Sequence, residues 1–310
     1  MNILFVFFNF FVWASTFSLA KASMKYSPPL YVTGVRMLIA GLILLAFLFI
    51  FKRKLLRVTK SQILPLVLLS LSAVYLTNAF EFWGLQYLTA AKACLIYSLS
   101  PFIAAFLSYL QFREKLTKRK AIGLLIGFFG FAPVFLFDTG SESSLGGLLF
   151  FSWAEIALML ATFFSVYGWI LLRKLGKDEG MSPVMANGSS MLIGGLFALT
   201  HSFFSESWAP TPVTEHAEFF KWVLLIVLVS NLICYNLYGW LLKRFTATFL
   251  SFAGLTTPLF AALWGWIMHK ESLPWPFFVA IAVVSLGLWL VYSEELRLGY
   301  IVKQQKIASS

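Results

Sequence analysis

Charged residues are scarce in this sequence, and their scarcity excludes whole classes of protein. Asp, Glu, Lys and Arg make up 12% of the 310 residues, whereas 60% are hydrophobic. A soluble globular domain carries roughly 25% charged residues. The mean hydropathy of +0.83 agrees with this imbalance. The composition therefore argues against a soluble domain and predicts an integral membrane protein.

Cysteine and histidine are also rare. The two cysteines, Cys94 and Cys234, lie inside apolar stretches, which argues against a disulfide framework and favours free thiols. The three histidines are scattered without metal-ligand spacing, and there is no HExxH, glycine-rich phosphate loop or GxSxG motif. We therefore predict no metal site, no cofactor, no enzyme activity and no nucleotide-driven pumping.

Long apolar runs dominate what the sequence does contain. A helix needs about 20 mostly apolar residues to cross the hydrocarbon core of a lipid bilayer. Stretches of this length recur along the whole chain with short connections between them, which predicts an all-α integral membrane protein. The ten predicted spans are residues 3–22, 31–51, 62–85, 90–111, 121–137, 148–172, 183–204, 219–242, 248–268 and 275–293.

The formal net charge of +11 does not indicate a nucleic-acid partner, because the basic residues gather on alternate loops. Lys and Arg cluster after the second, fourth, sixth, eighth and tenth spans, whereas the loops after the fifth and seventh spans are acidic. By the positive-inside rule, both termini are predicted to be cytoplasmic in a cytoplasmic (inner) membrane. The first span lacks a basic region before it, which argues against a cleaved signal peptide.

One stretch of the chain occurs twice. Residues 89–116 match residues 246–273 at a constant offset of 157, which pairs Pro101 with Pro258. Weaker matches relate spans 1, 2, 3 and 5 to spans 6, 7, 8 and 10. Five spans per copy is an odd number, so the copies are predicted to be inverted, with a substrate site near the midplane. The predicted units are residues 1–140, residues 146–295 and a cytoplasmic tail at 296–310.

Three motifs accompany this repeat: Trp13-Ala14-Ser15 in span 1, Tyr167-Gly168-Trp169 in span 6, and the Thr-Ala, Pro, Ala-Ala, Glu, Leu pattern shared by spans 4 and 9. Together with the ten spans, they resemble the EamA-type transporters of the drug/metabolite transporter superfamily. The resemblance covers nearly the whole chain and implies secondary transport through a cavity lined mainly by spans 1, 3, 4, 6, 8 and 9. It implies spans 5 and 10 at the periphery or a dimer face, in a monomer or homodimer.

Span 3 has one face that is polar in both copies. Ionisable residues inside the bilayer are costly and usually face a cavity or a partner. Asn78 and Glu81 share a helical face, and their repeat partners are Tyr235 and Tyr238. A shared cavity explains this better than chance, and we expect Glu81 to bind substrate or a proton. The alternative is a structural ion pair with a cation from span 2 or span 4.

These two cations are Arg36 and Lys92, which lie in the same outer half of the membrane as Glu81. They are candidate substrate contacts, and snorkelling to the outer headgroups is the alternative. Aromatic rings on cavity faces could stack a planar ring or hold a cation, with core packing as the alternative. The remaining candidate binding residues are Asn9, Trp13, Tyr97, Tyr167 and Asn231.

Two prolines complete the predicted site. Pro101 and Pro258 each remove a backbone hydrogen bond from the middle of a span. They are predicted to be hinges for the rocking motion, and a static kink is the alternative for each.

The predicted cavity has one carboxylate, two cations, several amides and many aromatic rings. This set suits a zwitterion that carries a positive centre and a planar ring. By analogy within the family, the expected small-molecule substrate is S-adenosylmethionine, exchanged for S-adenosylhomocysteine. The alternatives are an amino-acid, aromatic-metabolite or drug exporter of the same superfamily and, from another class, a non-transporting membrane receptor or assembly factor.

Overall fold

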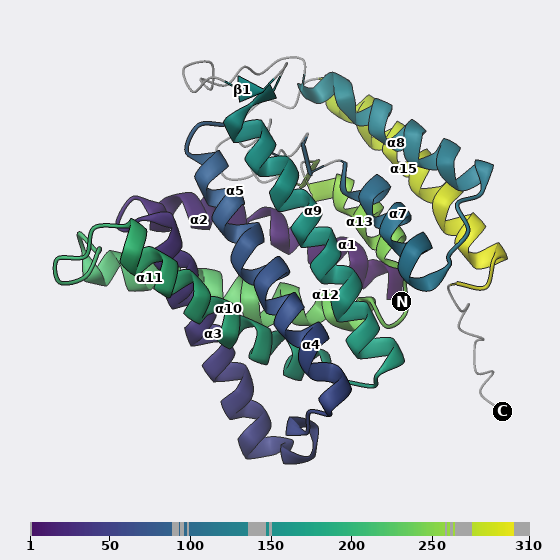
Figure 1. The fold of residues 1–310 in the computed structure, drawn as a ribbon. Helices are drawn as coiled ribbons and strands as arrows, with labels where there is room; N and C mark the ends of the chain where they lie inside the picture. Colours follow the sequence, from purple (N-terminus) through teal and green to yellow (C-terminus); the bar gives the residue numbers. More distant parts are fainter. Residues whose placement is uncertain are drawn as a thin grey trace.

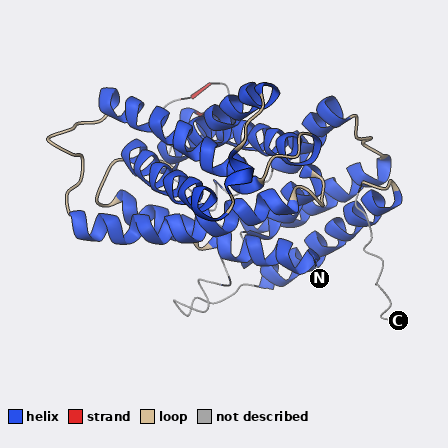
Figure 2. Cartoon of the chain, turned by 90° about the horizontal axis from the view of Figure 1, so that it is seen from below, coloured by secondary structure: helices blue, strands red, loops and turns tan. Residues whose placement is uncertain are grey.

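The structure is a computed structural model that describes residues 2–88, 93, 96–97, 99–135, 147–148, 151–257, 259–260, 263 and 275–300. Within these residues the chain is almost entirely helical (Figure 2). The strands β1 (Gly147–Leu148) and β2 (Phe151–Ser152) form a small antiparallel pair. The predicted all-α architecture is therefore confirmed.

Five helical stretches in the described part are long and apolar enough to cross a membrane: Pro29–Phe51, Lys60–Leu85, Trp153–Asp178, Pro183–Ser205 and His216–Leu241. They correspond to the predicted spans 2, 3, 6, 7 and 8. Three shorter apolar helices, Ile3–Ala14, Ser100–Phe112 and Ala247–Thr256, fall within the predicted spans 1, 4 and 9.

The elements follow one another along the chain as shown in Figure 1. In order, the α-helices are α1 (Asn2–Ala14), α2 (Thr16–Met24), α3 (Pro29–Phe51), α4 (Lys60–Leu69), α5 (Thr77–Leu85), α7 (Ser100–Phe112), α8 (Lys118–Phe135), α9 (Trp153–Arg173), α10 (Pro183–Ser205), α11 (His216–Ile226), α12 (Tyr235–Leu241), α13 (Ala247–Ala253) and α15 (Trp275–Arg297). Between them lie the 3₁₀ turns η1 (Arg53–Leu56) and η6 (Gly254–Thr256) and the π-helical segments η2 (Ser70–Leu76), η4 (Lys174–Asp178) and η5 (Val227–Cys234).

Several helices begin at residues that suit a helix start. Proline occupies the first turn of both α3 and α10, where its missing N–H has no partner to lose. A capping box starts α9, because the Glu155 N–H donates to Ser152 Oγ at 3.2 Å and the Ser152 N–H donates to Glu155 Oε2 at 2.6 Å. This cap gives Glu155 a local structural role.

Two pairs of helices that the repeat relates to each other pack closely through glycine. Helix α3 lies along α10, and α8 lies along α15 at one edge of the molecule (Figure 1). A Cβ atom on Gly41 of α3 would lie 2.7 Å from the Leu192 nitrogen of α10, and one on Gly287 of α15 would lie 2.7 Å from the Gly123 oxygen of α8. Small residues let membrane helices approach in this way. The α3–α10 pair contributes Arg36 of α3 to the cavity described below.

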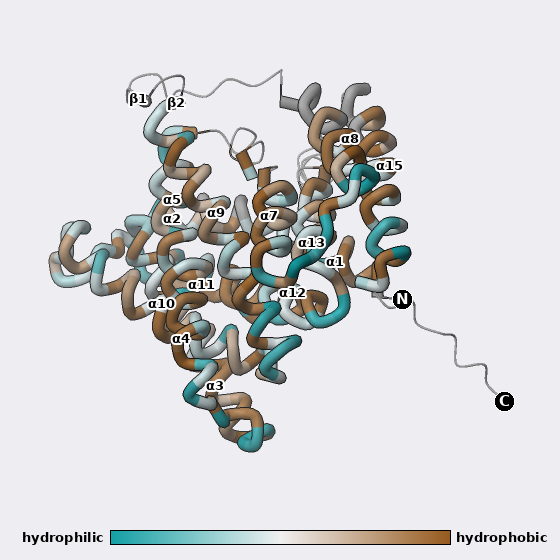
Figure 3. The backbone as a smooth tube through the Cα atoms, turned by 45° about the vertical axis from the view of Figure 1, so that its right-hand side comes forward, coloured by the Kyte–Doolittle hydropathy of each residue, from teal (hydrophilic) through white to brown (hydrophobic). Residues whose placement is uncertain are grey.

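The outer surface of the bundle is apolar. Large side chains such as Phe51, Leu64 and Phe204 are exposed, Phe204 by 80%. Hydrophobic residues extend along most of the helices, whereas the turn that follows α3 is hydrophilic (Figure 3). An apolar surface of this extent suits a lipid environment rather than water, so the surface agrees with the composition.

Candidate functional site

A cavity lies between helices from both halves of the chain. Its volume is about 180 Å³, more than tenfold the space of roughly 10–15 Å³ that one water molecule needs. Its lining residues come from α1, α2, α3, α5, α7, α9, η5, α12, α13 and η6, from Tyr97 before α7 and from Thr257 after η6. Both copies of the repeat therefore contribute to one space.

Most of the predicted binding residues line this cavity. The structure brings together residues that lie up to about 225 positions apart in the chain. Those that line the cavity are Trp13, Arg36, Asn78, Glu81, Tyr97, Tyr235 and Tyr238.

Three of the predicted residues are not part of the lining. Asn9 and Asn231 are fully buried, and Asn231 Nδ2 lies 3.0 Å from the sulfur of Met37. The ring of Tyr167 stacks on Phe163 instead, with centroids 6.5 Å apart. Asn9 and Asn231 therefore pack inside the bundle, whereas Tyr167 is partly buried against the exposed Phe163.

The remaining predicted residues, Lys92, Pro101 and Pro258, belong to the predicted fourth and ninth spans. Lys92 and Pro258 lie outside the described residues. Pro101 is buried and stands in the first turn of α7, where a proline starts a helix rather than interrupting one. The predicted hinge role of Pro101 would therefore act at the start of α7.

One wall of the cavity is polar and comes from the first half of the chain. An Arg36 Nη2 hydrogen bonds to Asn78 Oδ1, and Asn78 Nδ2 donates to the carbonyl oxygen of Val74 at 2.7 Å. The Tyr97 hydroxyl donates to Glu81 Oε2 at 2.6 Å. Each of the two charged side chains is thus held by a neutral partner, and in the described part of the chain neither is in an ion pair.

Arg36 is also held from the side. Its guanidinium lies 5.2 Å from the centroid of the Phe82 ring, and the side chain is only 5% exposed. Its Nε atom has no hydrogen-bond partner among the described residues. A buried cation with donors to spare can bind a carboxylate with paired hydrogen bonds, so this wall can recognise an anionic group.

A second part of the lining, the aromatic wall, comes mainly from the second half. Trp169 of α9 lies 4.4 Å from Tyr238 and 5.2 Å from Tyr235 of α12, measured between ring centroids. Trp13 of α1 contacts the same cluster, 5.7 Å from Trp169. Aromatic faces attract cations and stack on planar rings. This wall can therefore recognise a cationic or aromatic group.

Trp169 was not among the residues predicted for the site. The repeat alignment pairs Trp13 with Tyr167, but successive residues turn by about 100° in a helix, so Tyr167 and Trp169 lie on nearly opposite faces of α9. Ser165 and Val166 line the cavity together with Trp169. Helical spacing within α9 could have identified Trp169, whereas the alignment selected its neighbour.

Two π-helical segments place the cavity residues of α5 and α12. Segment η2 ends immediately before α5, and η5 ends immediately before α12. Their first residues, Ser70 and Val227, differ by 157 positions, the offset found in the sequence. The wider turn leaves carbonyl groups for side chains: the Thr77 hydroxyl donates to the Ser72 oxygen at 2.9 Å. Segments of this kind are frequent at functional sites.

The described residues contain no group of His, Cys, Asp or Glu side chains that could hold a metal ion. The site is instead a partly polar, partly aromatic cavity inside an apolar helical bundle. This arrangement defines a membrane protein that binds a small organic molecule between its helices. Pockets of this composition bind such ligands in many proteins.

The chain belongs to the EamA-like transporter family: the sequence model of this family matches residues 1–136 and again residues 152–293. The family consists of transporters, which agrees with the prediction that the chain is not an enzyme. A solved crystal structure superposes with a TM-score of 0.75 at 17% identity and covers 96% of this chain and 98% of that one. That likeness supports the fold alone.

Two similar proteins come from Chlamydia. An S-adenosylmethionine/S-adenosylhomocysteine transporter of Chlamydia muridarum (strain MoPn / Nigg) is 43% identical over 306 residues, which cover 98% of this chain and 96% of the relative. A protein of the same name from Chlamydia trachomatis serovar L2 is 44% identical over 306 residues, 98% of this chain and 93% of the relative.

Proposed function

We propose that this protein carries S-adenosylmethionine across a cytoplasmic membrane in exchange for S-adenosylhomocysteine. The observation that carries the proposal is the 43% and 44% identity, over 98% of the chain, to chlamydial transporters named for these two compounds. Similarity that extends through every element of the cavity supports a shared substrate, because each wall of the cavity is built from several separate helices.

The two walls suit the two ends of this substrate. Arg36 would bind the carboxylate of the amino-acid head, and Glu81 would bind its ammonium group, with Tyr97 orienting the Glu81 carboxylate. The aromatic cluster of Trp13, Trp169, Tyr235 and Tyr238 would hold the sulfonium and stack on adenine. Lys92 remains a proposed contact from outside the described residues.

We also propose ten spans in two inverted five-helix repeats, residues 1–140 and 146–295, followed by a tail at 296–310. The two separate family matches support a duplication. The basic loops favour cytoplasmic termini, with the protein inserted as a monomer or homodimer in the inner-membrane bilayer. Alternating access would arise from rocking of the repeats around the midplane cavity, with Pro101 and Pro258 as hinges.

Counterflow in proteoliposomes tests the function. Labelled S-adenosylmethionine is added outside liposomes that contain unlabelled S-adenosylmethionine or S-adenosylhomocysteine. We expect uptake with both internal loads and none with internal amino acids or nucleosides. Protein-free liposomes are the control.

Two outcomes would contradict the proposal. Exchange of amino acids alone would refute the adenosyl substrate and indicate an amino-acid exporter. Failure of the folded protein to exchange any of these compounds would refute transport and favour a receptor or an assembly factor.

A further inference from the structure

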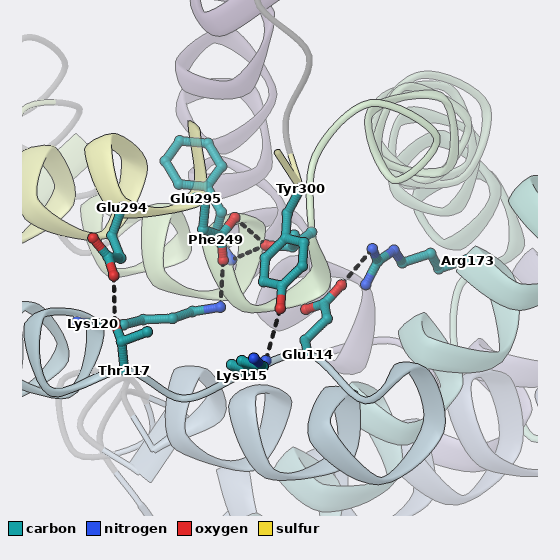
Figure 4. A network of polar contacts seen from close by, with 10 residues as sticks. Glu114, Lys115, Thr117, Lys120, Arg173, Phe249, Glu294, Glu295 and Tyr300 are labelled. Carbon is teal, nitrogen blue, oxygen red and sulfur yellow. Dashed lines mark hydrogen bonds and ion pairs between the residues drawn. The ribbon is translucent and has the colours of Figure 1, made fainter. Parts of the chain in front are cut away.

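A second buried polar cluster lies at the end of the bundle that carries the basic loops (Figure 4). Lys120 Nζ lies 2.6 Å from Glu295 Oε1, and their side chains are 2% and 0% exposed. Arg173 Nη2 lies 2.6 Å from Glu114 Oε1, and their side chains are 3% and 5% exposed. Four charged residues are thus withdrawn from solvent in two close ion pairs, and the transport site uses none of them.

Each ion pair connects the two halves of the chain. Glu114 follows α7 and Lys120 lies in the first turn of α8, both in the first half. Arg173 ends α9 and Glu295 lies near the end of α15, both in the second half. The pairs therefore join the two parts that must move relative to each other if the halves rock.

Neutral and surface groups complete the cluster. The Thr246 hydroxyl donates to Glu295, and the Thr117 hydroxyl donates to Glu294 Oε1 at 2.7 Å. The Lys115 N–H donates to the Tyr300 hydroxyl at 2.8 Å. The Thr117 and Lys115 contacts again join the segment between α7 and α8 to α15 and the residues that follow it, whereas the Thr246 contact joins α15 to the start of α13.

The cluster lies just beyond the aromatic wall of the cavity. Arg173 is four residues after Trp169 in α9, which places it about 6 Å further along the helix axis. Thr246 caps α13 and is five residues before the cavity residue Ser251, a separation of about 7.5 Å along the helix axis. Between them, Phe249 is 1% exposed. The buried ion pairs therefore lie about one to two helical turns from the cavity, on the side of this end of the bundle.

The Glu114–Arg173 pair is only partly satisfied. Glu114 Oε2 and the Nε and Nη1 atoms of Arg173 have no hydrogen-bond partner in the described part of the chain. Burial of two charges costs about as much as their attraction returns. When this end of the bundle opens, water would reach the Glu114 and Arg173 atoms, and its hydrogen bonds would offset the loss of the ion pair. Such a pair suits an element with two states better than a permanent brace.

We propose that the ion pairs Glu114–Arg173 and Lys120–Glu295 form a latch that closes the basic end of the cavity and separates when the cavity opens to that side. The latch rests on the proposed alternating-access transport. It holds the halves together while substrate enters from the opposite side, and it assigns this structure to the state closed at the basic end.

The latch is tested by the accessibility of one introduced cysteine to a labelling reagent. No substrate is added, so a negative result for the latch can be distinguished from a negative result for the proposed transport. The reporter is Ser251→Cys, which lines the cavity, in a background with Cys94→Ala and Cys234→Ala. A membrane-impermeant maleimide is applied to inside-out and to right-side-out vesicles. The labelling rate from each side measures how often the cavity opens to that side.

The test variant, Glu114→Gln with Arg173→Met, removes both charges of one pair. We expect labelling from the basic side to rise and labelling from the other side to fall, so that the ratio of the two rates increases by about fivefold or more, the lower range of a typical coupling free energy. The charge-exchanged variant, Glu114→Arg with Arg173→Glu, should label close to the parent rates. A matched control neutralises the exposed Glu218–Lys221 pair, which is 3.0 Å long and remote in sequence from the latch, and should change nothing.

Unchanged labelling from both sides in the neutralised variant would overturn the latch. An equal rise from both sides would also overturn it, because that result indicates general loosening. If this variant does not fold, Lys120→Met with Glu295→Gln breaks the other pair in the same assay and is judged by the same two outcomes.

Discussion

Among the described residues, charged side chains gather in the cavity and in the latch, and the two places differ in how the charge is paired. In the cavity, Arg36 is bonded to the Asn78 amide and Glu81 to the Tyr97 phenol. In the latch, Lys120 and Glu295 lie 2.6 Å apart with opposite charges. A neutral partner positions a charge without cancelling it, so the cavity charges remain available to a ligand, whereas the latch charges neutralise each other.

The comparison predicts different consequences of mutation. Removing one partner of a buried ion pair leaves an uncompensated buried charge and lowers stability. Removing a charge that is held by a neutral partner leaves no such charge behind and should lower substrate binding instead. The predictions below follow this contrast from the largest expected effect to the smallest.

Lys120→Met is expected to have the largest effect, on stability. It leaves the fully buried Glu295 without its cation, at a cost of about 3–5 kcal/mol in the free energy of unfolding. The measurement is the thermal midpoint of the purified protein in detergent. The control is Lys120→Met with Glu295→Gln, which removes both charges and should recover most of the loss. Equal midpoints for the single variant and the unsubstituted protein would contradict the role assigned to this pair.

Arg36→Met should abolish most exchange while the protein stays folded. Hydrogen bonds to charged groups contribute about 1.5–3 kcal/mol, so the apparent affinity for S-adenosylmethionine should fall by roughly 10–100-fold. Arg36→Lys keeps the charge but loses the planar fork, and an intermediate affinity is expected in the same counterflow assay. If Arg36→Met lowered the thermal midpoint as much as Lys120→Met does, the contrast between the cavity and the latch would be contradicted.

Glu81→Gln separates two roles of the cavity carboxylate. The amide can still accept the Tyr97 hydroxyl, so the geometry is retained and only the charge is lost. If Glu81 binds the ammonium group, exchange affinity should fall by about tenfold. A proton-coupling role would instead leave exchange intact and abolish accumulation driven by a pH gradient. Full activity in both assays would remove Glu81 from the site.

The sequence allowed much of this site to be predicted because helical spacing and the repeat act together. Asn78 and Glu81 share a face of the third span, and their repeat partners Tyr235 and Tyr238 also reach the cavity. The all-α membrane fold follows from composition and from the length of the apolar runs. Both are local properties of the chain, so they can be read without the structure.

The latch could not be predicted, because it depends on contacts between distant parts of the chain. Lys120 belongs to a basic cluster that suggests a solvated loop, yet it is 1% exposed. Glu114 lies just after the predicted span 4, and its partner Arg173 lies 59 positions later, where no local pattern connects the two. The π-helical segments were missed for another reason: a single wider turn leaves the apolar pattern almost unchanged.

Trp169→Leu tests the aromatic wall against its neighbour. Loss of a cation–π contact costs about 0.5–2 kcal/mol, so exchange affinity should fall by several-fold. The matched control is Tyr167→Leu, since the Tyr167 ring stacks on Phe163 and is not part of the cavity lining. Counterflow at graded substrate concentrations gives both affinities. A larger effect of the Tyr167 change than of the Trp169 change would contradict the placement of the cavity face of α9.

Arg297→Met should have the smallest effect and sets the lower limit of the comparison. Arg297 lies 2.7 Å from Glu294, three residues away on the same helix, and its side chain is 66% exposed. Glu294 is itself 0% exposed, but the Arg297 side chain lies in solvent, where screening weakens the ion pair, so stability and exchange should both stay close to those of the unsubstituted protein. Glu294 also keeps its hydrogen bond from the Thr117 hydroxyl. A loss of exchange in Arg297→Met would mean that pairing at the surface, and not only in the buried latch, controls the basic end.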